Sequence, residues 1–413
     1  MNKRLEKIIK HAYTQTPMYM NLAEEQNLNI QDSSIEDIWG SLPIINKELI
    51  LKHPSSAISI SHMALLINKK LVDARTSGST GKCMEIYWTK EDLKRSLLSL
   101  WIYRKKQYDI NPDDKYCYFY TTRTTGPVET ESEVRDYAMG FSKCGLDKEK
   151  MKLFYEQMLE FQPVWMLLQP SLAILLQQCV EEYNLPKIES LRYIELSAEM
   201  LSKGTKHKLE EVLGCNISNQ YGCNEANSIA YECKEGHLHC VNSNVYVEVM
   251  KDGKLAEDGE EGEIVITSLH NYAMPIIRYT VGDRGMIYHN SECACGNPNP
   301  ILDLTVGRSN DWVLDRDGNR INTYIFVRAA ENVNRVMEDA IKQFQIIQED
   351  YDEFTIRLVL DDEDDAYDVE ELFIENFIQP SLDGAVFNFE YHDALFPEEN
   401  GKLLYFKSMI ETK

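Results

Sequence analysis

The 413-residue sequence predicts an α/β fold, in which a large N-terminal α/β body with a β-rich section precedes a small α+β domain. Strand and helix periodicities alternate up to residue 243, and residues 244–288 then have mostly strand character. After a boundary near Gly307-Arg308, the mixed pattern returns. These observations predict two domains, 1–307 and 308–413, joined by a hinge.

The elements of the N-terminal body follow from periodicity and from prolines, which interrupt helices. Residues 1–70 are expected to form helices that break at Pro43 and Pro54. The next expected elements are strands in LVDAR and MEIYWT, a helix at 91–107, a strand at 115–122, a helix from Pro170-Ser171 and a strand in RYIELS.

The β-rich section and the C-terminal domain are defined by strand runs and turn residues. The section at 244–288 contains NVYVEVM, a KDGK turn, GEIVITSL and MIYH. The C-terminal domain is expected to contain a strand–turn–strand at 311–322, a helix at 328–343, a strand at 354–360, a helix at 368–378 and a strand at 386–392.

Composition limits the classes of partner. The formal net charge is −24, so the surface repels nucleic acid and anionic lipid, and we expect neither as a partner. No apolar run approaches the roughly 18 residues that a membrane span needs. The N-terminal sequence lacks the apolar segment of a secretory signal, and these features predict a cytoplasmic protein.

The ten cysteines do not form an evident disulfide framework, and six of them are scattered. The other four, Cys233, Cys240, Cys293 and Cys295, lie in ECKEGHLHC and ECACG, which also supply His237 and His239. Four such sulfur and nitrogen ligands are typical of a closed, structural zinc site. The alternative is a set of unliganded thiols.

The stretch TSGSTGK at 76–82 combines hydroxyls, glycines and a lysine, as phosphate-binding loops do. It is not a Walker loop, because only two residues separate Gly78 from Gly81-Lys82 and no helix follows. A kinase catalytic loop is also absent from the sequence, which argues against a kinase or a GTPase. The loop instead joins two predicted strands.

Five further segments follow this loop along the chain. They are LSAEMLS at 196–202, QYGCNEAN at 220–227, PIIRYTVGDRG at 275–285, VGRSNDW at 306–312 and FPEENGKLL at 396–404. Together, in this order, the six segments resemble those of the adenylate-forming (ANL) superfamily, in its phenylacetate–CoA ligase-like branch.

The resemblance implies an adenylation domain over 1–307, a mobile lid over 308–413, and ATP and Mg²⁺ as cofactors. The implied nucleotide contacts are Thr76, Ser77, Gly78, Ser79, Thr80 and Gly81 on the phosphates, Ser197, Ala198 and Glu199 beside adenine and the acyl pocket, Tyr221, Gly222 and Asn224 beside adenine and the α-phosphate, Asp283 on the ribose hydroxyls, and Arg308 on ribose or phosphate. The implied catalytic residues are Lys82, Glu225, which holds Mg²⁺, and Lys402, which swings into the site.

Three positions depart from the family pattern. Ser197 stands where the family has glycine, Asn224 replaces threonine but keeps hydrogen-bonding capacity, and Asn310 occupies the position of the hinge aspartate. Asp311 follows directly, so the hinge residue is either Asn310 or Asp311.

The same resemblance implies a reaction. A small aromatic carboxylic acid, such as a dihydroxybenzoate for siderophore synthesis, is expected to become an acyl-adenylate and then a thioester on a carrier protein. Tyr137, Met139 and Phe141 are candidates for the acid pocket, and Arg135 or Lys143 for binding phenolic oxygens. Two alternatives remain, an aryl-CoA ligase of the phenylacetate–CoA type and a catalytically degenerate nucleotide-binding protein.

Members of this branch that carry paired Cys…Gly-x-x-His and Cys-x-Cys-Gly segments resemble the cysteine-rich part of the chain. This resemblance selects Cys233, His239, Cys293 and Cys295 as zinc ligands and leaves out His237 and Cys240.

Overall fold

The computed structural model describes residues 3–30, 33–75, 84–120, 132–143, 146–199, 203–290, 292–308, 312–314, 320–337, 340–374, 382, 384–396 and 403–410. The chain forms two compact units. The first unit holds residues 1–111 and 220–305, and the second holds residues 112–219 and 306–413. The predicted domains 1–307 and 308–413 cut the chain only once, and they stay a prediction.

The N-terminal part of the first unit is helical, as predicted. On α1 (Lys3–Gln15), Leu5, Ile8, Ile9 and Ala12 recur at helical spacing and are buried. The following helices are α2 (Pro17–Glu25), α3 (Ile35–Ile38), η1 (Trp39–Ser41), α4 (Lys47–Lys52), η2 (Pro54–Ala57), η3 (Ile60–His62), α5 (Met63–Ile67) and α6 (Lys90–Tyr108). The side chain of Thr89 caps α6 by accepting the backbone N–H of Asp92 at 3.0 Å.

Two short antiparallel strands, β1 (Val72–Arg75) and β2 (Glu85–Trp88), flank residues 76–83. The prediction that the TSGSTGK loop joins two strands is therefore confirmed. Thr76, Ser77, Gly78, Ser79, Thr80, Gly81 and Lys82 themselves lie outside the described residues.

The sheet of the first unit has the strand order β12-β11-β13-β14-β15-β10-β9-β8. Its strands are β8 (Asn216–Cys223), β9 (Asn227–Glu232), β10 (Leu238–Cys240), β11 (Val245–Lys251), β12 (Lys254–Leu255), β13 (Gly262–Ser268), β14 (Tyr279–Tyr288) and β15 (Ile301–Arg308). The predicted KDGK turn joins β11 to β12, and both of its central residues, Asp252 and Gly253, have positive φ, as a tight hairpin turn requires.

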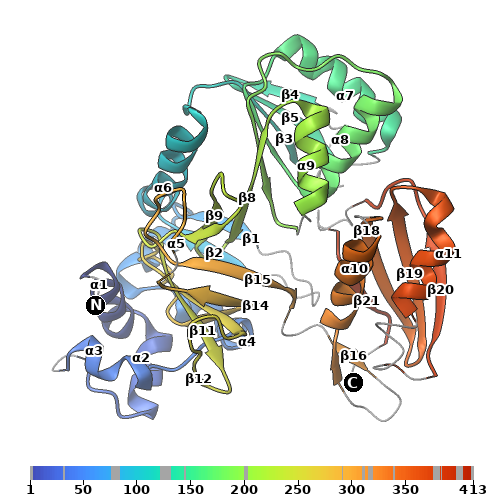
Figure 1. Ribbon diagram of the computed structural model, residues 1–413. Helices are drawn as coiled ribbons and strands as arrows, with labels where there is room; N and C mark the ends of the chain where they lie inside the picture. The colour runs from blue at the N-terminus through green and yellow to red at the C-terminus, as the bar shows by residue number, and fades with distance from the viewer. Residues whose placement is uncertain are drawn as a thin grey trace. The chain divides into compact units, whose positions relative to one another are not determined.

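The sheet of the second unit has the order β7-β6-β3-β5-β4, and its neighbours are parallel except for the β4–β5 hairpin. Its strands are β3 (Tyr116–Tyr120), β4 (Ser132–Arg135), β5 (Ala138–Ser142), β6 (Trp165–Leu168) and β7 (Tyr193–Ser197). Figure 1 shows its three helices in green: α7 (Lys148–Phe161), α8 (Pro170–Glu182) and α9 (Lys203–Leu213). Apolar residues of these helices and strands share one core.

The C-terminal segment of the second unit has its own sheet, β20-β19-β18-β21, which packs against α10. Its elements are β16 (Trp312–Leu314), β17 (Arg320–Asn322), α10 (Tyr324–Val336), β18 (Ile341–Asp350), β19 (Glu353–Leu360), η4 (Glu363–Asp365), α11 (Ala366–Glu371), β20 (Val386–Tyr391) and β21 (Phe406–Ser408).

The helix predicted at 328–343 is wrong at its C-terminal end, because α10 ends at Val336 and β18 begins at Ile341. Three buried glutamines of β18 explain the error, since glutamine is typical of helices. Their side-chain amides bond backbone groups here: Gln345 donates to Leu404 O at 2.9 Å and Gln348 to Leu314 O at 2.7 Å, and Gln343 accepts from Leu395 N at 2.9 Å. Residues 375–381 lie outside the described part, so the predicted end of the second helix is untested.

Among the residues that the structure describes, none of the helices combines the length and the apolar character that crossing a bilayer demands.

A buried ion pair ties the N-terminal helices to the sheet of the first unit. Arg278 Nη2 lies 3.1 Å from Glu248 Oε1 on β11, and Arg278 Nη1 donates to Trp39 O at 3.3 Å and also to Leu42 O. Both charged side chains are almost fully buried. Removing one partner therefore leaves an uncompensated charge in the core.

We expect Glu248→Ala to lower the free energy of unfolding by about 3–5 kcal/mol, because the Arg278 guanidinium would lose its buried counter-ion. Urea denaturation followed by tryptophan fluorescence measures this change. The control is Lys251→Ala, which breaks the exposed Lys251–Glu260 pair and is expected to cost less than about 1 kcal/mol. Equal losses of unfolding free energy in the two variants would contradict a stabilising role for the buried Arg278–Glu248 pair.

Candidate active site and metal centre

Two hydroxyl–carboxylate contacts connect the QYGCNEAN and PIIRYTVGDRG segments in the first unit. Tyr221 on β8 donates to Asp283 Oδ2 on β14 at 2.7 Å, and Tyr279 on β14 donates to Glu225 Oε1 at 3.0 Å. Each segment thus supplies one tyrosine and one carboxylate. The structure places Tyr221, Glu225 and Asp283, which were predicted from sequence, in two contacts between the same two segments.

The sheet must curl for these contacts to form. Three strands separate β8 from β14 in the sheet order, and a flat sheet would hold them roughly 19 Å apart. Tyrosine and carboxylate side chains cannot bridge that gap. Tertiary folding therefore creates this site.

Glu225 lies in the turn between β8 and β9 and is only 7% exposed. Burial, with the Glu225 charge as a second cause, raises the pKa of the neighbouring Cys223 thiol well above the usual value. A buried carboxylate of this kind is suited to hold a hard cation such as Mg²⁺.

Several residues that fix this turn were not predicted from sequence. Trp88 Nε1 donates to Asn224 O at 3.3 Å, and Asn244 Nδ2 donates to Ala226 O and Ser228 O, both at 2.7 Å. Tyr279 was within a quoted segment but had no role assigned. Its position four residues before Asp283 was the available signal.

Gly222 allows β8 and β9 to approach at an irregularity of the strand register beside Tyr221. A Cβ atom at this position would lie 2.3 Å from Asn227 O, so a larger residue forces the backbone apart. The glycine is required by a close backbone approach.

The residues predicted beside the acyl pocket lie in the second unit, at the end of β7. Ala198 has φ +78°, a conformation that is costly for a residue with a side chain and that occurs often at functional sites. Glu199 Oε2 accepts from Ser171 N at 2.9 Å, and Oε1 accepts from Ser171 Oγ and from Leu403 N, both at 3.1 Å.

Lys143 follows β5 and donates to Gln169 Oε1, which follows β6. Lys143, Gln169 and Glu199 therefore all lie just beyond the carboxyl ends of parallel strands, where α/β sheets bind ligands. Burial lowers the pKa of Lys143 to about 8, against the effect of Glu199. Burial also raises the pKa of Glu199, although the Ser171 and Leu403 donors and the Lys143 charge oppose it.

The other candidates for the acid pocket are corrected. Phe141 and Met139 belong to the hydrophobic core of the second unit, where Phe141 packs on Phe154 at a centroid distance of 4.7 Å. The Tyr137 side chain is 51% exposed, and Arg135 is exposed and pairs with Glu133. Alternation along β5 directs Phe141 and Met139 into the helix-covered face.

Other predicted residues cannot be located. Lys402, Asn310 and Asp311 lie outside the described residues, and Arg308 ends β15 without a described side chain.

The four predicted zinc ligands converge in the first unit. The candidate ligand atoms of Cys233, His239, Cys293 and Cys295 all lie within 4.8 Å of one another. Pairing of β10 with β15 brings the turn at 293–296 beside the β9–β10 hairpin. Cys240 alternates with His239 along β10 and is buried in the core, on the face away from the cluster.

The distances in the cluster fit a tetrahedral zinc site. Cys233 Sγ lies 3.7 Å from Cys293 Sγ, and Cys295 Sγ lies 3.3 Å from His239 Nε2. Usual Zn–S and Zn–N lengths give tetrahedron edges of about 3.8 and about 3.5 Å. The ring atom Nδ1 of His239 lies 2.9 Å from Asn299 O, a contact that leaves Nε2 to face the cluster.

Two thiols of the cluster have shifted pKa values in opposite directions. Burial raises the pKa of Cys233 to about 12. Burial also acts to raise the pKa of Cys293, but hydrogen bonds from the Cys295 backbone and from His239 outweigh it and lower the pKa to about 6.

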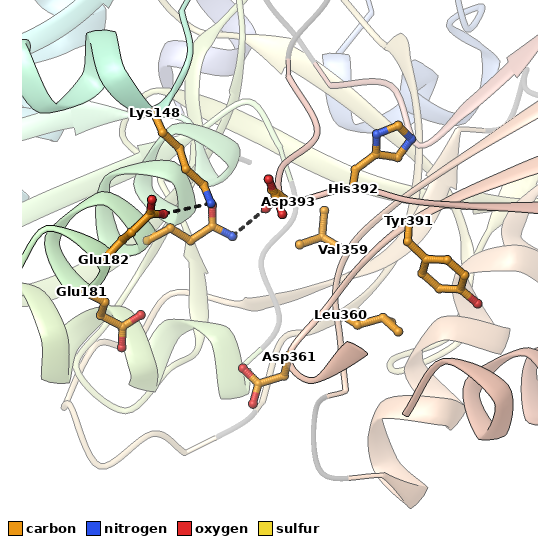
Figure 2. A pocket seen from close by; sticks show the side chains of 10 residues that line it. Lys148, Glu181, Glu182, Val359, Leu360, Asp361, Tyr391, His392 and Asp393 are labelled. Atoms are coloured by element: carbon orange, nitrogen blue, oxygen red, sulfur yellow. Dashed lines mark hydrogen bonds and ion pairs between the residues drawn. The ribbon is translucent and has the colours of Figure 1, made fainter. Parts of the chain in front are cut away.

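The second unit contains a cavity of about 280 Å³. Figure 2 shows the side chains that line it. The cavity lies between residues of α7 and α8 and residues 359–361 and 391–393, with Lys148–Glu182 and Gln178–Asp393 contacts on one side. Four carboxylates line it: Glu181, Glu182, Asp361 and Asp393. Their charge disfavours a phosphate-bearing ligand, and none of the predicted site residues lines this cavity.

Comparison with family models gives two matches. Residues 74–273 match the AMP-binding enzyme family, and residues 313–409 match the CapK C-terminal domain.

Characterised relatives match most of the chain. Protein CapK of Staphylococcus aureus is 22% identical over 89% of this chain and 79% of its own. Phenylacetate-coenzyme A ligase of Thermus thermophilus is 24% identical over 84% of this chain and 76% of its own. Among solved structures, 2-hydroxyisobutyryl-CoA ligase in the postadenylation state superposes with a TM-score of 0.73 at 19% identity, over 98% of this chain and 88% of that one.

Residues 74–273 therefore resemble the AMP-binding enzyme family, and the chain has the fold of an adenylate-forming enzyme. Over most of its length the chain is similar to the phenylacetate–CoA ligase-like branch of this superfamily.

We expect Gly222→Ala to lower the free energy of unfolding by about 1–3 kcal/mol, because the added methyl group overlaps the Asn227 carbonyl. Urea denaturation measures the loss. Gly40→Ala is the matched control, since its Cβ would meet no atom within 4 Å, and it is expected to change stability by less than about 1 kcal/mol. Equal losses of stability in the two variants would show that the Asn227 carbonyl does not restrict the side chain at position 222.

Proposed function

We propose that the chain activates a small aromatic carboxylic acid with ATP and transfers the acyl group to a thiol. In the first step, a carboxylate oxygen attacks the α-phosphorus, the bond to the bridging oxygen breaks, and pyrophosphate leaves with the electron pair. In the second step, the thiol sulfur attacks the acyl carbon and loses its proton, and AMP leaves. The proposal rests on the paired Tyr221–Asp283 and Tyr279–Glu225 contacts.

The residues of the first unit fit the nucleotide half of this reaction. The Asp283 carboxylate has acceptor capacity for ribose hydroxyls beyond its bond to Tyr221. Glu225 would hold Mg²⁺, which supplies positive charge to the phosphate oxygens when it is bound. Tyr279 orients the Glu225 carboxylate toward that task. Asn224 is assigned to the α-phosphate and Tyr221 to adenine.

Lysines and hydroxyls complete the proposed site. Thr76–Gly81 and Lys82 are assigned to the β- and γ-phosphates, and Arg308 to ribose or phosphate. Lys402 is assigned to the charge that develops on the α-phosphate during adenylation, where a preorganised cation is effective. Rotation about residues 308–311 would then exchange Lys402 for a thiol-binding surface.

Coenzyme A is the acceptor that the relatives support, since the Thermus thermophilus protein is a phenylacetate-coenzyme A ligase and the structural neighbour is also a CoA ligase. A carrier-protein thiol and a siderophore role remain predictions from the sequence. An aromatic acid with a phenolic oxygen fits the Lys143 ammonium at the carboxyl edge of the second sheet. The acid of the structural neighbour, hydroxyisobutyrate, is not aromatic, so an aliphatic hydroxy acid is the second candidate.

We also propose a structural zinc ion on Cys233, His239, Cys293 and Cys295. Four protein ligands close the coordination shell and leave no open position for catalysis. The ion would fasten the β9–β10 hairpin to the turn before β15.

Acid-dependent ATP–pyrophosphate exchange tests the proposed function. A panel of benzoates, phenylacetates, hydroxy acids and fatty acids is expected to show stimulation by an aromatic acid, and mass spectrometry then identifies the thioester formed with coenzyme A or with a carrier protein. Lys402→Ala should lower exchange by about 100- to 1000-fold, because an electrostatic contact to the transition state is lost.

The same variant is expected to form thioester at the normal rate when acyl-adenylate is supplied. Lys254→Ala, which removes an exposed lysine of β12, is the control and should leave both half-reactions unchanged. An absence of stimulation by every acid would refute the proposed activity.

Zinc content is expected to be one ion per chain by plasma mass spectrometry, and Cys293→Ala should reduce it because three ligands bind zinc more weakly than four. Cys240→Ala, which removes a thiol next to His239 but outside the cluster, should keep the ion. A chelator should lower the melting temperature of the wild type, because it removes the ion. It should leave the melting temperature of zinc-depleted Cys293→Ala unchanged. Stoichiometric zinc that survives in Cys293→Ala would exclude this ligand set.

A further inference from the structure

The backbone on both sides of Glu225 is held by side chains from other parts of the first unit. On the N-terminal side, Trp88 Nε1 of β2 donates to Asn224 O at 3.3 Å. On the C-terminal side, Asn244 Nδ2 donates to Ala226 O at 2.7 Å. The two donors are 136 and 18 positions away from their acceptors along the chain. The position of the Glu225 backbone therefore depends on tertiary contacts.

The Asn244 amide serves a second acceptor as well. Its Nδ2 donates to Ser228 O at 2.7 Å, and both residues are completely buried. The opposite orientation of the amide would set its oxygen against two carbonyl oxygens, so only the NH₂ group can face them. One side chain therefore connects the end of the turn to the beginning of β9.

Asn244 is fixed by its own backbone. Asn244 N donates to Val241 O at 2.7 Å, and Leu269 N donates to Asn244 O at 3.0 Å. The next residue, Val245, begins β11 and pairs with Ser268 of β13. The donor that holds the turn is thus part of the sheet and has little freedom to move.

The turn ends in an uncommon backbone conformation. Asn227 has φ +61°, and its Nδ2 donates to Ser96 Oγ of α6 at 2.6 Å. A conformation of this kind persists where the surrounding contacts enforce it. With Trp88 and Asn244, three elements of the first unit determine the path of the chain around Glu225.

We propose that Asn244 and Trp88 are positioning residues that hold the Glu225 turn in the geometry that binds Mg²⁺. The proposal rests on the proposed function, in which Glu225 holds this ion. Tyr279 orients the carboxylate itself at 3.0 Å, whereas Asn244 and Trp88 fix the backbone that carries it. A ligand on a fixed backbone loses less conformational freedom when it binds the ion. Loss of these contacts therefore weakens Mg²⁺ binding more than it slows the reaction.

Asn244→Ala is expected to raise the Mg²⁺ concentration for half-maximal ATP–pyrophosphate exchange by about 10-fold, because the residue supports a metal ligand. The exchange rate at saturating Mg²⁺ should stay within about threefold of the wild type, since Glu225 is still present. Asn271→Ala is the matched control. Asn271 is equally buried in the same unit and accepts Met274 N at 3.0 Å in a different turn. Its loss should leave the Mg²⁺ dependence unchanged.

Trp88→Phe tests the other side of the turn and keeps an aromatic ring in the core. It removes the indole donor to Asn224 O, and we expect a smaller rise in the required Mg²⁺ concentration, about 2- to 5-fold. If Asn244→Ala fails to fold, this variant still tests whether the backbone contacts control Mg²⁺ binding.

Two readouts do not depend on turnover. In calorimetric titrations without acid, Mg²⁺ should tighten ATP binding to the wild type, because Glu225 and the phosphates share the ion. The gain should be smaller in Asn244→Ala and unchanged in Asn271→Ala. Peptides that span residues 223–228 should exchange amide hydrogens faster in Asn244→Ala, and at the wild-type rate in Asn271→Ala.

Unchanged Mg²⁺ dependence in either variant of the turn would overturn the role of the residue that it replaces. An equal rise in Asn271→Ala would assign the effect to a general loss of stability and would overturn both roles. Glu225→Gln, measured alongside, tests the proposed function separately. If Glu225→Gln keeps the wild-type Mg²⁺ dependence, the assignment of Mg²⁺ to Glu225 fails. If Glu225→Gln loses it and Asn244→Ala does not, only the positioning role of Asn244 fails.

Discussion

A buried carboxylate that must be compensated is the constraint on which the arrangement of the first unit depends. Glu225 is almost removed from solvent, and the Tyr279 hydroxyl meets one of its oxygens at 3.0 Å. Burying an anion is costly unless donors or a cation offset it. The reciprocal contact between Tyr221 and the half-buried Asp283 joins the same two segments a second time. Both contacts require the sheet of the first unit to curl, and this curl brings two distant segments to one place.

The cysteine cluster lies at the end of β9 that is opposite to Glu225. Glu225 lies two residues before this strand, and Cys233 follows it directly. Fixing the hairpin at Cys233 therefore limits the movement of the strand that leads to Glu225. A closed zinc site would do this without taking part in the reaction. The pairing of β10 with β15 explains why residues near 293 meet residues near 235.

In the second unit, polar residues are brought together because the strands of a parallel sheet end at the same edge. Lys143, Gln169 and Glu199 come from three strands and meet because parallel strands end at one edge. Glu199 then connects this edge to α8 through Ser171 and to the C-terminal segment through Leu403. One carboxylate links the sheet, the helix and the C-terminal segment. Ala198, with its positive φ, precedes it at the point where the chain must turn.

The sequence by itself determined the local elements and the order of the motifs. Short-range chemistry sets these features: apolar periodicity defines α1, the Thr89 cap begins α6, the turn residues define the β11–β12 hairpin, and the Cys-x-Cys-Gly run defines one half of the cluster. Tertiary structure alone decided that Tyr221 reaches Asp283, that Phe141 belongs to the core, and that glutamines occupy a buried strand in β18. These outcomes depend on partners distant along the chain, such as the Leu404 carbonyl that satisfies Gln345. Local propensity carries no information about those partners, because they become neighbours only when the sheets have formed.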